Sequence, residues 1–300
     1  MFRRLIPALV LCAVLPAGQA LAKVRVAASL NDLASIASSV GGDQVEVFAI
    51  ARATADVHRV EALPSYMVKV SRAQIYLKVG LGLDQWADAI IDGSRNPRLK
   101  QVDCSRGVRI LEVPTGRVDA SMGDVHPNGN PHYWLDPRNG GVIARTIADA
   151  LAQADPSHAG DYRARAEAFA KEAEATWARE KEMANALPQK TIFTYHRSWS
   201  YFVDAFGLEV AATAEPVPGI PPTARHLAEL VATAKSRRVQ LLLQEPYFSA
   251  DAGRFLAREA GVRTVVATPV CDATTAGSYL AHFGSVLRAI TDAVNRKETP

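Results

Sequence analysis

The sequence predicts an α/β protein of two Rossmann-like lobes, each with a central parallel sheet, joined by one long rigid helix. Three observations lead to this fold class. Short apolar runs alternate with amphipathic stretches up to residue 154, the alternation returns from residue 188, and the stretch between them keeps a helical spacing of apolar residues. Strands that alternate with helices in sequence form parallel sheets with helices on both faces.

The N-terminal lobe is expected over residues 23–154. Its predicted strands are short apolar runs, at 24–28, 44–50, 75–79, 100–102 and 108–111. Its predicted helices are amphipathic, at 30–40, 64–71, 86–91 and 142–153. Asn31 is the expected cap of the first helix.

Residues 155–187 are predicted to form the connecting helix, because Tyr162, Ala166, Phe169 and Ala173 are three or four residues apart. A helix of this length extends roughly 45 Å, which favours a rigid backbone over a flexible linker.

The C-terminal lobe is expected over residues 188–300. Its predicted strands lie at 191–195, 209–212, 239–243 and 264–267. Its predicted helices lie at 199–206, 223–235, 250–260 and 278–295.

Residues 1–22 are typical of a cleaved export signal. Arg3 and Arg4 precede an apolar stretch, and Ala20-Leu21-Ala22 is a small-residue cleavage site. The apolar stretch is too short to span a bilayer. The sequence therefore predicts a soluble periplasmic protein that starts near Lys23 and does not insert into the membrane.

The mature chain is close to electrically neutral, because the signal removes two arginines and no acids. It has no dense stripe of Lys and Arg interleaved with aromatics, so a nucleic-acid partner is not expected. Cys104 and Cys271 remain, one from each half of the chain. They either pair in the oxidising periplasm or stay separate buried thiols.

Three histidines are candidate metal ligands. His58, His132 and His196 follow predicted strands or lie in loops on the same side of the sheets, where α/β proteins bind ligands. Imidazole suits zinc, manganese and related ions. We expect the three side chains to converge on one ion between the lobes, with His126, in the same loop as His132, able to substitute for it.

The stretch Gly129–Pro137 is the most specific part of this pattern. Asp136 precedes Pro137, which biases it to extended backbone, and its side chain is expected to cap the following helix and so hold the loop of His132.

Three segments resemble those of a known family. Residues 56–65 are similar to its D-P-H-x-Y-E-P-x-P-S segment, residues 131–137 to P-H-x-W-L-D-P, and residues 194–202 to T-S-H-x-x-x-x-Y-F. These are motifs of the cluster A-I substrate-binding proteins, the zinc- and manganese-binding components of ABC importers. The resemblance covers essentially the whole mature chain.

The resemblance implies that His58, His132 and His196 are metal ligands, because the family's ligand histidines map onto them. It also implies two lobes joined by a long helix, with the metal buried between them. The expected function is binding of a divalent ion and its delivery to the membrane permease of an ABC importer. A monomer without enzymatic activity is expected.

The fourth ligand departs from the family pattern. The family usually has an aspartate just after the last strand, where this chain has Thr268-Pro269. Asp272 is the favoured replacement. Glu245, which matches a family glutamate that orients a ligand or supports the lobe interface, and water are the alternatives.

Zinc is the expected ion and manganese the alternative, because manganese prefers more oxygen ligands. The long His/Asp-rich loop of many zinc-dedicated members is nearly absent here. A zinc-dependent periplasmic hydrolase is the competing function class. It needs an open coordination position and a general base, and the chain has no H-E-x-x-H motif.

Overall fold

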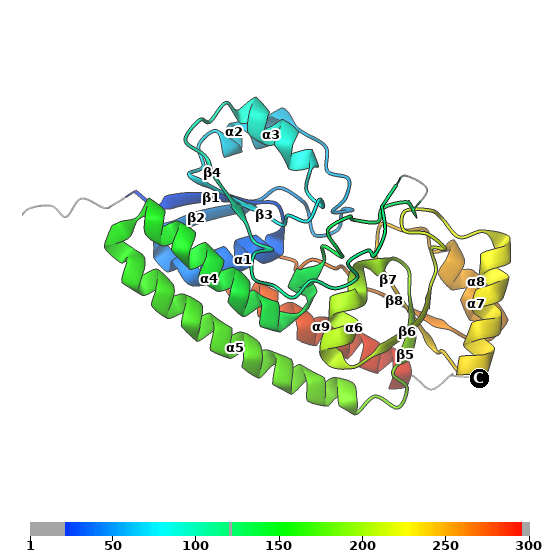
Figure 1. The fold of residues 1–300 in the computed structure, drawn as a ribbon. Coiled ribbons are helices and arrows are strands. Elements are labelled where there is room, and N and C mark those ends of the chain that lie inside the picture. Colours follow the sequence, from blue (N-terminus) through cyan, green and yellow to red (C-terminus); the bar gives the residue numbers. More distant parts are fainter. Residues whose placement is uncertain (1–21, 120–121, 296–300) are drawn as a thin grey trace, which may run out of the picture.

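The computed structural model describes residues 22–119 and 122–295, which fold as two α/β lobes bridged along one side by a long helix (Figure 1). This confirms the predicted fold class. The predicted signal, apart from Ala22, lies outside the described residues. Among the residues that are described, no helix is both long enough and apolar enough to cross a membrane.

The N-terminal lobe is built on a four-stranded parallel sheet in the order β2-β1-β3-β4. Its strands are β1 (Val24–Ala28), β2 (Val45–Ala49), β3 (Ile75–Lys78) and β4 (Lys100–Asp103). Successive side chains of a strand face opposite sides, so Val26 and Ala28 of β1 pack on one face and Ala27 on the other. Both faces are covered by helices: α1 (Asn31–Gly41) on one, α2 (Pro64–Val70) and α3 (Trp86–Ser94) on the other (Figure 1).

The C-terminal lobe repeats this topology in the order β6-β5-β7-β8, again all parallel. Its strands are β5 (Thr191–Thr194), β6 (Glu209–Thr213), β7 (Leu241–Gln244) and β8 (Arg263–Val266). Its helices are α6 (Ser200–Phe206), α7 (Ala224–Arg237), α8 (Asp251–Ala260) and α9 (Ser278–Asn295). Within each lobe the carboxyl ends of the strands lie at one edge of the sheet, where the loops that carry the histidines begin.

Two antiparallel helices connect the lobes. α4 (Pro137–Ala154) leads through a 3-10 turn at Pro156–His158 into α5 (Ala159–Asn185), which has 27 residues and runs along the length of the molecule (Figure 1). α5 packs against α1, α4, α6 and α9. The division into 23–154, 155–187 and 188–300 stays a prediction; α9, from the end of the chain, also contacts α1 of the first lobe.

One hydrophobic cluster runs through both lobes. It contains Leu33 of α1, Trp134 before α4, Phe169 of α5, Phe202 of α6 and Phe283 of α9. Burial of a side chain of this size is worth about 1.5–3 kcal/mol, so the contacts that cross between the lobes are a large part of the stability of the fold. The two lobes are therefore fixed against each other by a shared core.

The structure corrects two expectations from the sequence and decides between two alternatives for the cysteines. Residues 108–111 are not a strand: the amide of Leu111 donates to Tyr201 Oη (2.9 Å), and its carbonyl accepts from Asn130 N (2.9 Å). Asn31 does not cap α1; its side chain donates to the carbonyl of Cys271 (2.9 Å). Cys104 and Cys271 are separate buried thiols.

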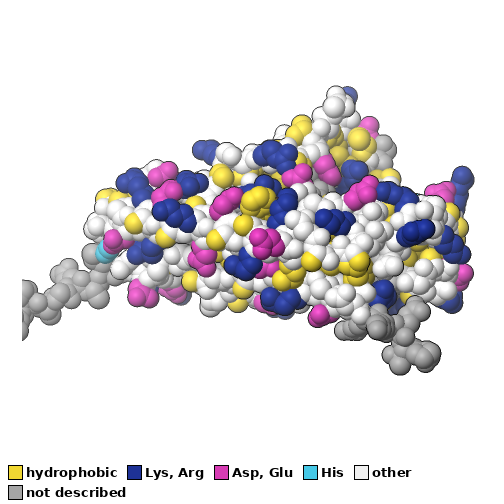
Figure 2. Space-filling model, turned by 90° about the horizontal axis from the view of Figure 1, so that it is seen from below, with side chains coloured by type: hydrophobic (Ala, Val, Ile, Leu, Met, Phe, Trp, Pro, Cys, Tyr) yellow, Lys and Arg dark blue, Asp and Glu magenta, His cyan; other side chains and the backbone are white. Residues whose placement is uncertain are grey.

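The surface carries charges of both signs. On the face in Figure 2, basic and acidic side chains are interspersed. Arg145 of α4 and Glu167 of α5 form an ion pair, with Nε and Oε1 2.7 Å apart. Both are half exposed, so such a pair contributes at most about 1 kcal/mol.

Candidate metal centre

The three predicted histidines come together at the carboxyl ends of the strands. His58 lies in the loop after β2, His196 lies two residues after the end of β5, and His132 lies in the loop between β4 and α4. One ligand atom from each lies within 4.8 Å of the others, with His132 and His196 buried and His58 half-buried. The ring centroids are 5.1 Å apart for His58–His132 and for His58–His196, and 5.9 Å apart for His132–His196.

The same local turn orients two of the rings. Asp56 Oδ1 accepts from the amide of His58 (2.9 Å) and lies 3.0 Å from its Nδ1. Asn130 Oδ1 accepts from the amide of His132 (3.0 Å) and lies 2.9 Å from its Nδ1. In both cases the oxygen comes from a side chain two residues before the histidine, a spacing at which Asp and Asn bond to the backbone ahead of them.

His196 is oriented by a residue of the neighbouring strand loop. Its Nδ1 lies 2.7 Å from Glu215 Oε2, and Glu215 is buried just after β6. The same oxygen accepts from the amide of Gly219 (3.0 Å). Glu215 therefore fixes both the ring of His196 and the following loop.

These contacts leave the other ring nitrogen available. An imidazole whose Nδ1–H donates to an oxygen carries its lone pair on Nε2. The hydrogen bond at Nδ1 also makes the Nε2 atom a better metal ligand. The Nε2 atoms of His58 and His132 are buried and have no hydrogen-bond partner in the protein. A buried polar atom without a partner costs about 1–3 kcal/mol, which binding of a cation recovers.

The protonation of the rings follows from their surroundings. Burial lowers the pKa of His132 well below its ordinary value, and the neighbouring His58 and His196 lower it further. Burial also lowers the pKa of His196, but the hydrogen bond to Glu215 and the charge of Glu245 outweigh it, so its net shift is upward. His132 is therefore neutral near pH 7, whereas His196 holds a proton more readily.

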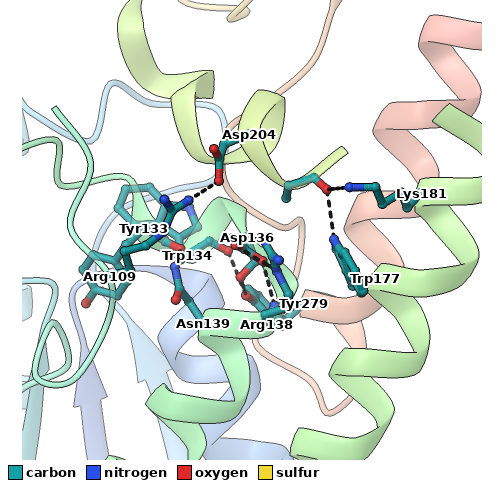
Figure 3. Close-up of polar contacts among 11 residues, drawn as sticks. Arg109, Tyr133, Trp134, Asp136, Arg138, Asn139, Trp177, Lys181, Asp204 and Tyr279 are labelled. Atoms are coloured by element: carbon teal, nitrogen blue, oxygen red, sulfur yellow. Dashed lines mark hydrogen bonds and ion pairs between the residues drawn. The ribbon is translucent and has the colours of Figure 1, made fainter. Parts of the chain in front are cut away.

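The loop of His132 is held by a network around the start of α4 (Figure 3). Asp136 caps α4, as predicted: its Oδ1 accepts from the amide of Arg138 (2.9 Å), and its Oδ2 from the guanidinium of Arg138 (2.8 Å). Tyr279 of α9 donates to the carbonyl of Trp134 (2.8 Å), and Asn139 donates to that of Tyr133 (2.9 Å). Residues from both halves of the chain thus fix the segment that carries His132.

A second contact in Figure 3 joins α5 to α6. Trp177 Nε1 donates to the carbonyl of Ala205 (2.9 Å), and Lys181 Nζ approaches the same oxygen (3.5 Å). It ties the C-terminal part of the long helix to the second lobe.

The structure does not bring Asp272 to the three histidines. Asp272 is exposed, and its electrostatic neighbours include Asp32 and His282. Glu245 is buried directly after β7 near His196; neither of its oxygens has a hydrogen-bond partner, and burial raises its pKa to about 7. Among the described residues, no carboxylate joins the group of ligand atoms.

His126 is the fourth histidine near the centre. Its ring centroid lies 5.6 Å from that of His58, and it lines a cleft together with His132, His196 and Asp124. The sequence did not reveal the oxygens that hold the Nδ1 atoms of the three histidines. The two-residue spacing could have indicated Asp56 and Asn130, but Glu215 is 19 residues from His196 and has no local signal.

Proteins with similar sequence or fold include several that bind metal ions. A putative metal-binding protein of Treponema pallidum is 27% identical over 243 residues, 80% of this chain and 77% of that protein. The crystal structure of a ZnuA deletion mutant with zinc bound has a TM-score of 0.78 at 27% identity, covering 92% of this chain and 99% of that chain. The substrate-binding protein FpvC of Pseudomonas aeruginosa, in complex with Mn²⁺, has a TM-score of 0.75 at 25% identity, covering 91% and 98%.

A match to a family model shows which protein family the chain belongs to. Residues 26–293 match the model described as the periplasmic component A of the zinc-uptake complex. This match covers most of the chain, including both lobes and all three histidines, and the family is one of substrate-binding proteins rather than enzymes. The chain therefore belongs to the family of periplasmic A components of zinc-uptake complexes.

Proposed function

We propose that the protein binds one divalent metal ion in the periplasm, zinc by preference, and delivers it to the membrane permease of an ABC importer. The proposed ligands are the Nε2 atoms of His58, His132 and His196. The observation that carries the proposal is the convergence of three imidazoles, with ligand atoms within 4.8 Å of one another, whose Nδ1 atoms are each held by an oxygen.

Zinc is favoured over manganese by the chemistry of the donors. Three nitrogen ligands without a carboxylate suit zinc, whereas manganese prefers oxygen. Manganese is the second candidate, because FpvC, with a similar fold, was crystallised with Mn²⁺.

The position of the centre suits transport better than catalysis. Its ligands come from both lobes, and two of the three are buried, so the ion is shielded from bulk water. A catalytic zinc needs an open position for water beside a general base. A zinc-dependent hydrolase is therefore the less favoured reading.

Metal titration of the mature protein tests the binding. The chain from residue 23 is stripped with a chelator and titrated with zinc in competition with an indicator of known affinity. We expect about one equivalent to bind, and the triple variant His58→Ala, His132→Ala, His196→Ala to bind none under competition. His158→Ala, far from the cleft at the start of α5, is the matched control. Full stoichiometric binding by the triple variant would refute the proposal.

Delivery is tested in the producing cell. Deletion of the gene should impair growth when zinc is chelated, and added zinc or the wild-type gene should restore it. The triple variant should not restore growth although it is exported. Equal rescue by the triple variant would contradict the proposed role in uptake.

A further inference from the structure

The cleft loop, residues 122–129, holds a histidine with an unused nitrogen beside the proposed metal centre. The Nε2 atom of His126 is buried and has no hydrogen-bond partner in the protein. Its ring is nearly parallel to that of His58, with an angle of 26° between the planes. A buried nitrogen of this kind is costly unless a ligand uses it.

None of the residues that the sequence offered for the fourth position joins the three histidines. Thr268, where the family usually has aspartate, donates its hydroxyl to the carbonyl of Val270 (2.6 Å) and is engaged locally. Asp272 is exposed. Glu245 lies outside the 4.8 Å that joins the three histidines, and it directly follows the buried strand β7, which fixes its backbone there, whereas His126 is carried by a loop.

The cleft loop reaches across the cleft to the second lobe. The amide of Asp124 donates to the carbonyl of Pro218 (2.9 Å). At Gly123, with φ +67°, a Cβ atom would lie 2.1 Å from the same carbonyl, so only glycine permits this approach. The amide of Gly219, next to Pro218, donates to Glu215, which also holds His196. The loop that carries His126 is thus docked beside Glu215, the residue that orients the proposed ligand His196.

The charge of the centre does not require a direct carboxylate ligand. Asp56 lies behind His58, and Glu215 lies behind His196. Carboxylates that accept from the Nδ1–H of ligand histidines balance part of the charge of the ion and make the rings more basic. Asp56 and Glu215 would therefore balance part of the charge of a dication that is held by neutral imidazoles.

We infer that Nε2 of His126 is the fourth protein ligand, so that zinc is held by four histidines in place of three histidines and a carboxylate. This inference rests on the proposed function. His126 lies outside the 4.8 Å limit that joins the other three, so the cleft loop moves its ring inward when the ion enters. Four nitrogens in a tetrahedral arrangement favour zinc and disfavour manganese.

X-ray absorption at the zinc edge of the loaded mature protein tests the inference directly. The wild type should show four imidazoles in the first coordination shell, and His126→Ala should show three with one oxygen ligand. The variant should still bind one equivalent, with affinity lower by at least about tenfold, because even partners behind the ligands are worth 10–100-fold. Its preference for zinc over manganese should also fall. His158→Ala is the control and should match the wild type.

The outcomes separate this inference from the proposed function. A wild type with three imidazoles, or a His126→Ala variant with unchanged spectrum and affinity, would overturn the role of His126 and leave zinc binding by the other three intact. A wild type that binds no zinc, or a triple variant of His58, His132 and His196 that binds it fully, would overturn both. The spectrum of the wild type does not depend on whether the variant folds.

Discussion

Burial of His132 keeps its ring unprotonated near pH 7, so a proton does not compete with a metal ion for the Nε2 atom. The ring is 2% exposed, and burial beside two further histidines holds its pKa well below the ordinary value. Asn130 holds its Nδ1, so the ring cannot turn its free nitrogen away from the cleft without losing that hydrogen bond. The ring of His132 is thus neutral and oriented, with its Nε2 atom unpaired, before any ion arrives, which lowers the cost of binding.

His132→Ala is expected to lose most zinc affinity, at least about 100-fold, because it removes the most buried proposed ligand. Asn130→Ala keeps the ligand but frees the ring, so we expect a smaller loss of about 10–100-fold. Titration against a chelator measures both. An alanine at 132 that binds as tightly as the wild type would contradict the proposed ligand set.

The pH dependence of binding should depend on His196. Its pKa is raised above the ordinary value because of Glu215 and Glu245, so as pH falls from 8 to 5 a proton occupies its Nε2 and zinc affinity drops. Glu215→Gln removes one of these charges, which lowers the pKa of His196. We therefore expect the drop to move to lower pH, with weaker affinity at pH 8 from the lost support. Zinc titrations at each pH would show an identical profile for both proteins if Glu215 had no such role.

Glu245 should make the metal-free protein less stable as pH rises. Its pKa is raised from 4.5 to about 7, so the folded state holds more protons than the unfolded state between these values. The free energy of unfolding then falls with increasing pH, by on the order of 3 kcal/mol from this group. Glu245→Gln should be more stable than the wild type at pH 8 and similar near pH 4.5, as measured by urea unfolding. A difference that does not change with pH would argue against a protonated Glu245.

Local motifs predicted that the three histidines come together, but contacts between distant parts of the chain determine what surrounds them. The oxygens of Asp56 and Asn130 act within two residues, where sequence carries information. The sequence favours Asp272 because it is the nearest acid to the position where the family has aspartate. Its segment is instead bonded to α1, through Asn31 to the carbonyl of Cys271 and through Ser35 to that of Thr275, and the carboxylate faces solvent.

At the scale of elements, the start of α4 joins the proposed site to the fold. Asp136 caps the helix, and one turn later Gly140 lies against the ring of Tyr279 from α9. The hydroxyl of Tyr279 donates to the carbonyls of Trp134 (2.8 Å) and Asp136 (3.1 Å). The close approach of α4 and α9 therefore sets the backbone that carries His132.

Gly140→Ala is expected to destabilise the protein by about 1–3 kcal/mol, because the added Cβ would lie 2.5 Å from Cε1 of Tyr279. Gly160→Ala in the first turn of α5 is the matched control: the added Cβ meets nothing within 4 Å, so we expect the free energy of unfolding to change by at most about 0.5 kcal/mol. Urea unfolding of both variants measures this. Equal effects of the two substitutions would contradict the proposed clash.

The periodicity of apolar residues predicted most of the helices and strands, and residues 108–111 show where it fails. The limits of α9 agree with the predicted 278–295. Residues 108–111 have the apolar character of a strand, but their backbone bonds to Tyr201 and to Asn130. Both partners lie far along the chain, so no local pattern could distinguish this segment from an edge strand.

At the scale of the molecule, the two lobes share one core. α5 spans them, and α9 returns from the second lobe to contact α1 of the first (Figure 1). The sequence predicted the long helix from its spacing of apolar residues. The return of α9 could not be predicted, because an amphipathic helix shows that one face is buried but not which partner buries it.

This shared core predicts small lobe movements on metal binding. Rotating the lobes apart would expose Trp134, Phe169 and Phe283, each worth about 1.5–3 kcal/mol of buried surface. The cleft loop, in contrast, is docked on the second lobe near Pro218 by few contacts. We therefore expect the radius of gyration from X-ray scattering to be unchanged within error between metal-free and zinc-loaded protein. Amide hydrogen exchange should slow on zinc binding mainly in residues 122–130 and 215–220, with α5 unchanged. A large change in the radius of gyration, or altered exchange along α5, would indicate a hinge movement and would contradict this prediction.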